Sequence, residues 1–257
     1  MNGLLQAPSA TAFDAVASAA SLLVYLVVAL VALARAPRDA RARTFLAVAL
    51  ASAVPYALSP LQWWKGNDIY TPSVIALTSA AFTVGSVALF HFTQVFPHRR
   101  PWISAHGRWI VAAYLVLPPP VAVISRALDA LLVAGSPAGG GIGTAGAGGI
   151  GVVAPEVAIL LVVLLIPAIL VVGVLLPCAG VLSLVKSWRD ADGRAKDRES
   201  TLWMLISQLG GGVLSVLILP MLHVIGIGAP WSVLIAALAY AFALLLPIAF
   251  ARYPLIT

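Results

Sequence analysis

Charged side chains are scarce in this sequence: Asp, Glu, Lys and Arg make up 9% of its 257 residues, whereas 61% are hydrophobic. A soluble domain of this length needs a more polar surface to face water. We therefore expect one integral membrane domain over residues 1–257, surrounded by membrane lipids. The net charge of +6 is interpreted as loop charge that orients membrane helices, and no nucleic-acid partner is expected.

The sequence also lacks residues and motifs that metal binding, retinal binding and common catalytic mechanisms require. The single cysteine, Cys178, excludes an intrachain disulfide and a thiolate metal site. The last apolar segment, 231–251, has no lysine to form a retinal Schiff base. No zinc-protease motif or nucleophile elbow occurs, and no acidic residue is expected at mid-membrane depth to relay protons. We therefore expect neither an enzyme nor a metal protein.

Seven segments are long and apolar enough to cross about 30 Å of hydrocarbon, which takes about 20 residues. They are 15–34, 44–63, 73–95, 109–134, 157–184, 202–227 and 231–251. Their apolar runs are continuous and do not alternate with polar residues, which predicts helices and an all-α, seven-helix transmembrane bundle. Three consecutive prolines from Pro118 should kink or break the fourth span. The glycine-rich segment 135–151 is expected to be a flexible outer linker.

Basic residues indicate the orientation of these helices. Thirteen of the 15 Lys and Arg residues follow the first, third, fifth and seventh spans. Positive loop charge marks the cytoplasmic side, so we expect the N-terminus outside and the C-terminus in the cytoplasm.

Two histidines fall within predicted spans. His91 lies six residues before Pro97, roughly 9 Å from the inner end of the third span at 1.5 Å per residue. His223 lies near the outer end of the sixth span, so the depths differ by about 20 Å, and metal–nitrogen bonds of about 2 Å cannot join both to one ion. We expect His91 to be hydrogen-bonded inside the bundle and no cofactor to be present. A haem or pigment held by His91 alone stays open.

Further polar and small residues in the spans suggest two roles. Ser79, Thr83 and Ser86 recur at helical spacing, which suits either helix packing or, with His91, the lining of a ligand site. On the outer side, Arg126 and Asp129 can pair along one helix, and Glu156 precedes the fifth span. They either pair structurally or contribute to ligand binding. Small residues are expected at close helix contacts: Ala15 and Ala19 on the first span, Gly173 and Gly180 on the fifth, and Gly210, Gly211 and Gly212 on the sixth.

Three motifs resemble one known family. The sequence LFHFTQVFPHRRPW (89–102) resembles the "HFxxxFP plus basic residues" signature of the seven-helix sensor module of ComP-like bacterial histidine kinases. The segments RESTLWMLISQLGGG (198–212) and LLLPIAFARYPL (244–255) look like the start of its sixth span and the end of its seventh. In the family, a signalling domain follows. This chain stops at Thr257, so we expect no kinase or other output domain in it.

The resemblance implies a stand-alone sensor-type module in the bacterial cytoplasmic (inner) membrane. It would bind a small or lipid-like ligand and signal to a separate membrane or cytoplasmic protein subunit through its inner basic residues. The residues expected to dock this partner are Arg99, Arg100, Lys186, Arg189, Arg194, Lys196 and Arg198. The alternative is a non-catalytic structural or assembly subunit of a larger respiratory or photosynthetic membrane complex.

Overall fold

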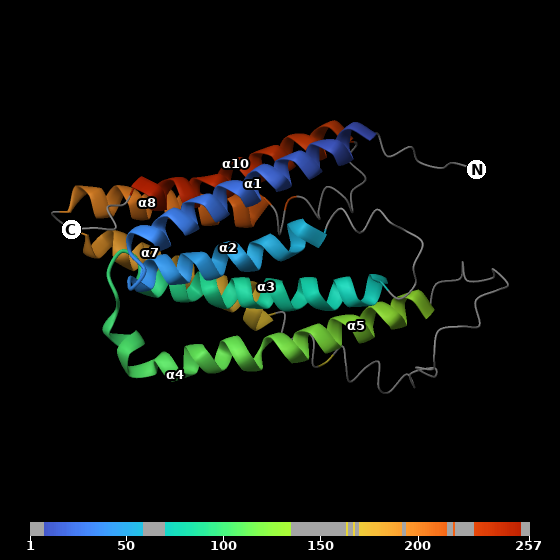
Figure 1. Ribbon diagram of the computed structural model, residues 1–257, viewed down its shortest axis with the longest axis horizontal. Coiled ribbons are helices and arrows are strands. Elements are labelled where there is room, and N and C mark those ends of the chain that lie inside the picture. The colour runs from blue at the N-terminus through green and yellow to red at the C-terminus, as the bar shows by residue number, and fades with distance from the viewer. Residues whose placement is uncertain are drawn as a thin grey trace.

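The computed structural model describes residues 8–58, 70–134, 170–191, 194–214 and 229–252, together with the single positions 163, 167 and 218. Within these ranges all regular structure is helical and no strand occurs, which confirms the all-α class (Figure 1). The helices are α1 Pro8–Arg35, α2 Ala40–Leu58, α3 Tyr70–Val95, α4 Pro101–Val116, α5 Pro118–Ala134, the π-helix η2 Leu170–Leu175, α7 Leu176–Asp190, α8 Ala195–Val213 and α10 Ala229–Arg252.

Three helical stretches of the described residues are long and apolar enough to cross a membrane. They are Ala76–Val95 in α3, Ala105–Ala127 across α4 and α5, and Leu170–Asp190 in η2 and α7. Two shorter apolar stretches are Ala19–Arg35 in α1 and Ala237–Arg252 in α10. The helices overlap the predicted spans, while the number of crossings stays a prediction. The predicted outer linker 135–151 lies outside the described residues.

The predicted proline break in the fourth span is confirmed. Helix α4 ends at Val116 and α5 begins at Pro118. Pro118, Pro119 and Pro120 have no N–H group to donate to the carbonyls four residues earlier, so three consecutive helical hydrogen bonds cannot form. Helical bonding continues around Leu117, whose N–H donates to Ala113 (3.2 Å) and whose carbonyl accepts from Val121 (3.4 Å).

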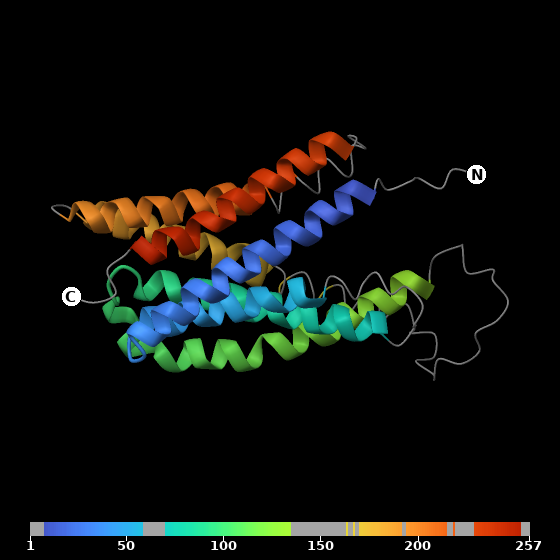
Figure 2. The same ribbon diagram turned by 45° about the horizontal axis from the view of Figure 1, so that its top comes forward.

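Six helices form a closed ring in the described part of the chain. Each helix contacts the next in the order α1, α2, α3, α7, α8 and α10, and α10 contacts α1 to close the ring. Helices α4 and α5 pack on α3 from outside this ring, and both views show them at the edge of the bundle (Figures 1 and 2). Helix α3 also contacts η2, so among the helices that the structure describes it has the most neighbours.

Four phenylalanine side chains fill the core of the six-helix ring near its basic end. Phe45 of α2, Phe92 and Phe96 of α3, and Phe250 of α10 are all fully buried. Ring centroids lie 4.4 Å apart for Phe45 and Phe250, 5.6 Å for Phe45 and Phe92, and 5.5 Å for Phe92 and Phe96. These are favourable aromatic separations. Phe92 and Phe96 are four residues apart and therefore share one face of α3. The HFxxxFP sequence thus contributes two core side chains.

A side-chain hydrogen bond joins the first and last helices. Pro247 lies inside α10 and has no N–H to donate to the carbonyl of Ala243, four residues earlier. The hydroxyl of Tyr25 in α1 donates to that carbonyl oxygen at 2.8 Å. The ring of Tyr25 also stacks on Phe45, with centroids 5.9 Å apart. Tyr25 therefore satisfies an acceptor that the proline leaves open, and it closes the ring between α1 and α10.

Gly210 allows α8 to approach α10 closely, as predicted. A Cβ atom at Gly210 would lie 2.5 Å from Cδ1 and 2.6 Å from Cγ of Phe242. At the next position, Gly211, the nearest atom would be the backbone nitrogen of Ala243 at 3.6 Å, an ordinary contact. The stiff ring of Phe242 therefore occupies the space above Gly210 and not that above Gly211.

Tyr25→Phe should lower the free energy of unfolding by about 1 kcal/mol, because it leaves the Ala243 carbonyl without a donor while keeping the stacked ring. In a Pro247→Ala background the loss should nearly vanish, because the new N–H at position 247 donates to Ala243. Unfolding in mixed micelles with increasing dodecyl sulfate, followed by circular dichroism, measures this double-mutant cycle. Equal losses in both backgrounds would contradict the assignment.

Gly210→Ala should destabilise the protein by about 1–3 kcal/mol, the usual cost of overpacking, since Phe242 must move. Gly211→Ala is the matched control and should be neutral or stabilising by up to about 1 kcal/mol, because alanine favours helix over glycine. The same unfolding measurement separates the two. Similar behaviour of both variants would show that the Phe242 ring does not restrict this contact.

Candidate functional site

Two hydroxyls of the polar face of α3, those of Thr83 and Thr93, bond to carbonyls of their own helix. Thr83 is fully buried and donates from Oγ1 to the carbonyl of Ser79 at 2.8 Å. Ser86 is buried on the same helix, and Ser79 is half-buried. A threonine bonded to its own helix satisfies its hydroxyl without a ligand. These contacts suit the packing interpretation, and a ligand role for Ser79, Thr83 and Ser86 stays a prediction.

The part of this face nearest the basic end of the bundle packs against α7. Thr93 is fully buried and donates to the carbonyl of Phe90 at 2.7 Å. Its own carbonyl accepts from Ser183 Oγ at 3.2 Å. A Cβ atom at Gly180 would lie 3.4 Å from Thr93 Oγ1, so this glycine faces α3 closely, as expected. Small and hydroxylated residues thus bring α3 and α7 together.

His91 is half-buried on α3 and faces α4. Its Nδ1 lies 3.5 Å from the hydroxyl of Tyr114, a long hydrogen bond, and the two rings meet edge to face with centroids 6.1 Å apart. His91 thus has a polar neighbour inside the bundle, as predicted. Among the described residues, no cluster of three or more His, Cys, Asp or Glu side chains could hold a metal ion. His223 lies outside the described residues.

The predicted outer ligand residues are only partly described. Arg126 is exposed on α5, a helix whose C-terminal end lies at the end of the bundle opposite the basic connections (Figure 1). The backbone of Asp129 lies on the same helix, but its side chain is outside the described residues, as is all of Glu156. Their pairing and their role in ligand binding stay predictions.

The basic residues predicted to dock a partner gather at one end of the bundle. The α1–α2, α3–α4 and α7–α8 connections lie side by side there, and contacts between their residues join all three (Figure 1). The side chains that are exposed at this end are Arg99, Lys186, Arg189, Arg194, Lys196 and Arg198, and Arg100 is half-buried. Sequence segments almost 100 residues apart therefore form one positively charged face.

Arg100 links the end of α3 to α7. Its Nη2 donates to the carbonyl of Ser183 at 2.6 Å and to Ser187 Oγ at 2.9 Å. Its Nε is buried and has no hydrogen-bond partner among the described residues. Arg100 is predicted from the sequence as a docking residue, whereas its contacts with Ser183 and Ser187 are not predicted. Serine near the end of an apolar helix is too common a feature to reveal this contact.

A carboxylate lies within the basic face. Asp197, in the first turn of α8, has a side chain only 13% exposed, and its Oδ2 lies 2.9 Å from His98 Nε2. Arg194 also contacts His98 Nε2 and lies 3.9 Å from Asp197. The Nε2 atom of His98 cannot donate to Asp197 and accept from Arg194 at once. With a proton on Nε2 it donates to Asp197, and without one it accepts from Arg194. Asp197 is not predicted as a site residue from the sequence, although an acid in a first helical turn is favourable.

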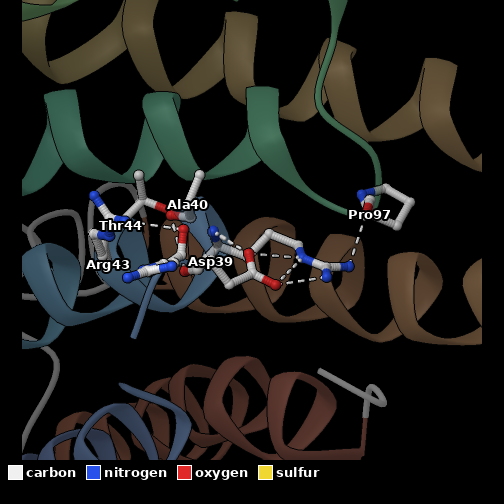
Figure 3. A network of polar contacts seen from close by, with 7 residues as sticks. Asp39, Ala40, Arg43, Thr44 and Pro97 are labelled. Atoms are coloured by element: carbon white, nitrogen blue, oxygen red, sulfur yellow. Dashed lines mark hydrogen bonds and ion pairs between the residues drawn. The ribbon is translucent and has the colours of Figure 1, made fainter. Parts of the chain in front are cut away.

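Arg41 joins the α1–α2 connection to the α3–α4 turn (Figure 3). Its guanidinium donates to Asp39 at 2.6 Å from Nη2 and to the carbonyl of Pro97 at 3.3 Å from Nη1. The backbone N–H of Arg41 also donates to Asp39 at 2.8 Å. Burial alone would raise the pKa of the Asp39 carboxyl, but the hydrogen bonds and charge of Arg41, with the charge of Arg43, hold it below the ordinary value of 3.8.

Two pockets open at this basic end. The first, of about 280 Å³, lies between the α3–α4 turn and the α7–α8 connection. It is lined by residues 97–101, 186–187, 190–191, 194 and 197. The second, of about 520 Å³, lies beside Trp188, whose ring holds the Arg198 guanidinium 4.7 Å from its centroid. Both pockets therefore border residues predicted to dock a partner.

Comparison with protein-family models, with curated proteins and with solved structures finds no match for this chain. The resemblance of its three motifs to ComP-like sensor modules therefore stays a prediction. The described geometry adds a packing role for Phe92 and Phe96 and a positively charged face beyond Pro97.

Asp39→Asn should lower the free energy of unfolding by about 1 kcal/mol at pH 7, because Arg41 loses a charged acceptor. The pKa of Asp39 is lowered by folding, so its ionisation stabilises the fold above the unfolded pKa, and this stabilisation is lost as pH falls through the folded pKa. The difference between variant and parent should thus shrink once pH falls below 3.8. Unfolding measured from pH 7 to pH 3 tests this. In an Arg41→Gln background most of this pH dependence should disappear; if it persists unchanged, Arg41 is not its cause.

Proposed function

We propose that this chain is a seven-helix protein of the bacterial cytoplasmic membrane, with its N-terminus outside and its basic face in the cytoplasm. It acts as a sensor-type module that binds a small or lipid-like ligand and passes a conformational change to a separate partner. Three membrane-length helical stretches support the membrane location. The gathering of the basic connections at one end, with the start of α1 at the other, supports the orientation (Figure 1).

The observation that carries the signalling role is the link from α3 to α7 through Arg100. Helix α3 packs against α2, α4, α5, α7 and η2. The guanidinium of Arg100, which follows the inner end of α3, donates to the carbonyl of Ser183 and to the hydroxyl of Ser187 in α7. A shift or rotation of α3 therefore moves the last turn of α7 and the exposed basic residues beyond it. Small helix shifts of this kind are a known means of transmitting a signal between packed helices.

The ligand would act by binding one arrangement of the helices more tightly than the other. The candidate contacts are those predicted on α3 and near the outer side: Ser79, Thr83, Ser86, His91, Arg126, Asp129 and Glu156. The Leu117 break between α4 and α5 lies close to this region along the chain and offers a place where the outer part of the bundle can bend.

A structural subunit of a larger membrane complex is the second candidate, and the apolar outer face of α4 and α5 favours it. Leu115 is 70% exposed, Val116 64% and Val123 65% in the monomer. Lipid chains suit this face, and so does an apolar helix of a neighbouring subunit.

Gentle solubilisation of native membranes, followed by native electrophoresis of the tagged chain, separates these functions. The sensor proposal expects a substoichiometric partner whose co-migration depends on the exposed basic residues. Arg189→Gln combined with Lys196→Gln should weaken the association by roughly fivefold, since each surface charge contributes up to about 1 kcal/mol. Arg35→Gln combined with Arg38→Gln removes the same charge at the same end, on another connection, and should change the association less than twofold.

A stoichiometric complex that survives in the Arg189 and Lys196 variant would instead support the structural subunit. A partner lost equally in both charge variants would contradict docking at the α7–α8 connection.

A further inference from the structure

We propose that the cavity between the α3–α4 turn and the α7–α8 connection binds a phosphate group, either on an anionic lipid or on a soluble compound. The cavity, about 280 Å³, is larger than the roughly 30 Å³ that one water molecule occupies in the liquid, so it has room for a phosphate and part of its substituent. The site concerns binding alone and does not require that a partner docks at the same end.

The charges that line the cavity favour an anion. Four basic side chains and two acidic ones line the cavity, together with His98. One of the carboxylates, Asp197, already has His98 at hydrogen-bond distance. The bases are Arg99, Arg100, Lys186 and Arg194, and the second acid is Asp190. Arginine is well suited to phosphate because its N–H groups are fixed in a planar fork.

Arg100 is held in place before any ligand arrives. Its Nη2 is committed to Ser183 and Ser187, which fixes the plane of the guanidinium. Its Nε is buried without an acceptor among the described residues, although buried donors are nearly always paired. Arg100 lines the cavity, so the charge of its guanidinium attracts a phosphate there, although the buried Nε itself is not accessible. The contacts to α7 thus orient a cation whose hydrogen bonding is incomplete.

Two helix N-termini border the same cavity. Helix α4 begins at Pro101 and α8 begins at Ala195, and the cap residues Arg100 and Arg194 provide no side-chain cap. The free N–H groups at the start of a helix carry partial positive charge and favour anions. Asp197 offsets part of this charge at α8, whereas α4 has no acid in its first turn. Pro101 has no N–H group and the N–H of Ile103 donates to the carbonyl of Arg100 at 3.1 Å, so the start of α4 contributes the partial positive charge of the helix end and not a set of free donors.

Binding is tested with purified protein in phosphatidylcholine nanodiscs, without any partner. One arm adds phosphatidylglycerol to the nanodiscs and counts bound lipid by native mass spectrometry after release. The other arm titrates inorganic phosphate and follows the fluorescence of the tryptophans. Saturable binding in the lipid arm alone identifies a lipid headgroup as the ligand, whereas binding in the phosphate arm identifies a soluble one.

Arg99→Gln combined with Lys186→Gln removes two exposed bases from the cavity lining and should weaken binding about tenfold. Arg35→Gln combined with Arg38→Gln, which lie outside the lining, should change it less than twofold. Arg100→Gln should abolish saturable binding, and its thermal unfolding shows whether the fold survives. Equal weakening in the first two variants, or no saturable binding of either probe to the parent protein, would overturn the proposal.

Discussion

The packing of four phenylalanine rings is the interaction on which the arrangement of this bundle depends. Phe45, Phe92, Phe96 and Phe250 join helices from the beginning, middle and end of the chain. In lipid, helices associate through van der Waals packing and interhelical hydrogen bonds, and the close ring contacts contribute packing of this kind. The basic turn begins directly after Phe96, and the core therefore determines where the charged face is placed.

Sequence patterns could predict the features that depend on local chemistry. Long apolar runs predicted helices, and the proline triplet predicted the interruption at Leu117, because each depends on the backbone of its own segment. Gly180 and Gly210 were expected at helix contacts because only small residues allow such an approach. The side of the membrane assigned to the basic loops matches one end of the bundle, although the orientation itself and the count of seven spans remain predictions.

Contacts between distant segments could not be predicted in the same way. The excess of positive charge in cytoplasmic loops predicts which side of the membrane a loop lies on, but not which side chains pair. The bonds from Arg100 to Ser183 and from His98 to Asp197 were therefore not predicted. The hydrogen bond from Tyr25 to Ala243 depends on which helix lies beside Pro247. The polar face of α3 was recognised, but sequence spacing could not show that Thr83 and Thr93 bond to their own helix.

The closed ring of helices has a mechanical consequence. If the six helices were arranged in an open row, a displacement of α3 could be transmitted to α8 only through the helices between them. Here two routes exist, a short one through α7 and a long one through α2, α1 and α10. Weakening the Tyr25 contact would leave the route through α7 as the main connection, whereas weakening the contacts of α7 would leave the route through α2, α1 and α10. Packing on one side of the ring therefore bears on how a displacement of α3 would be shared with the other side.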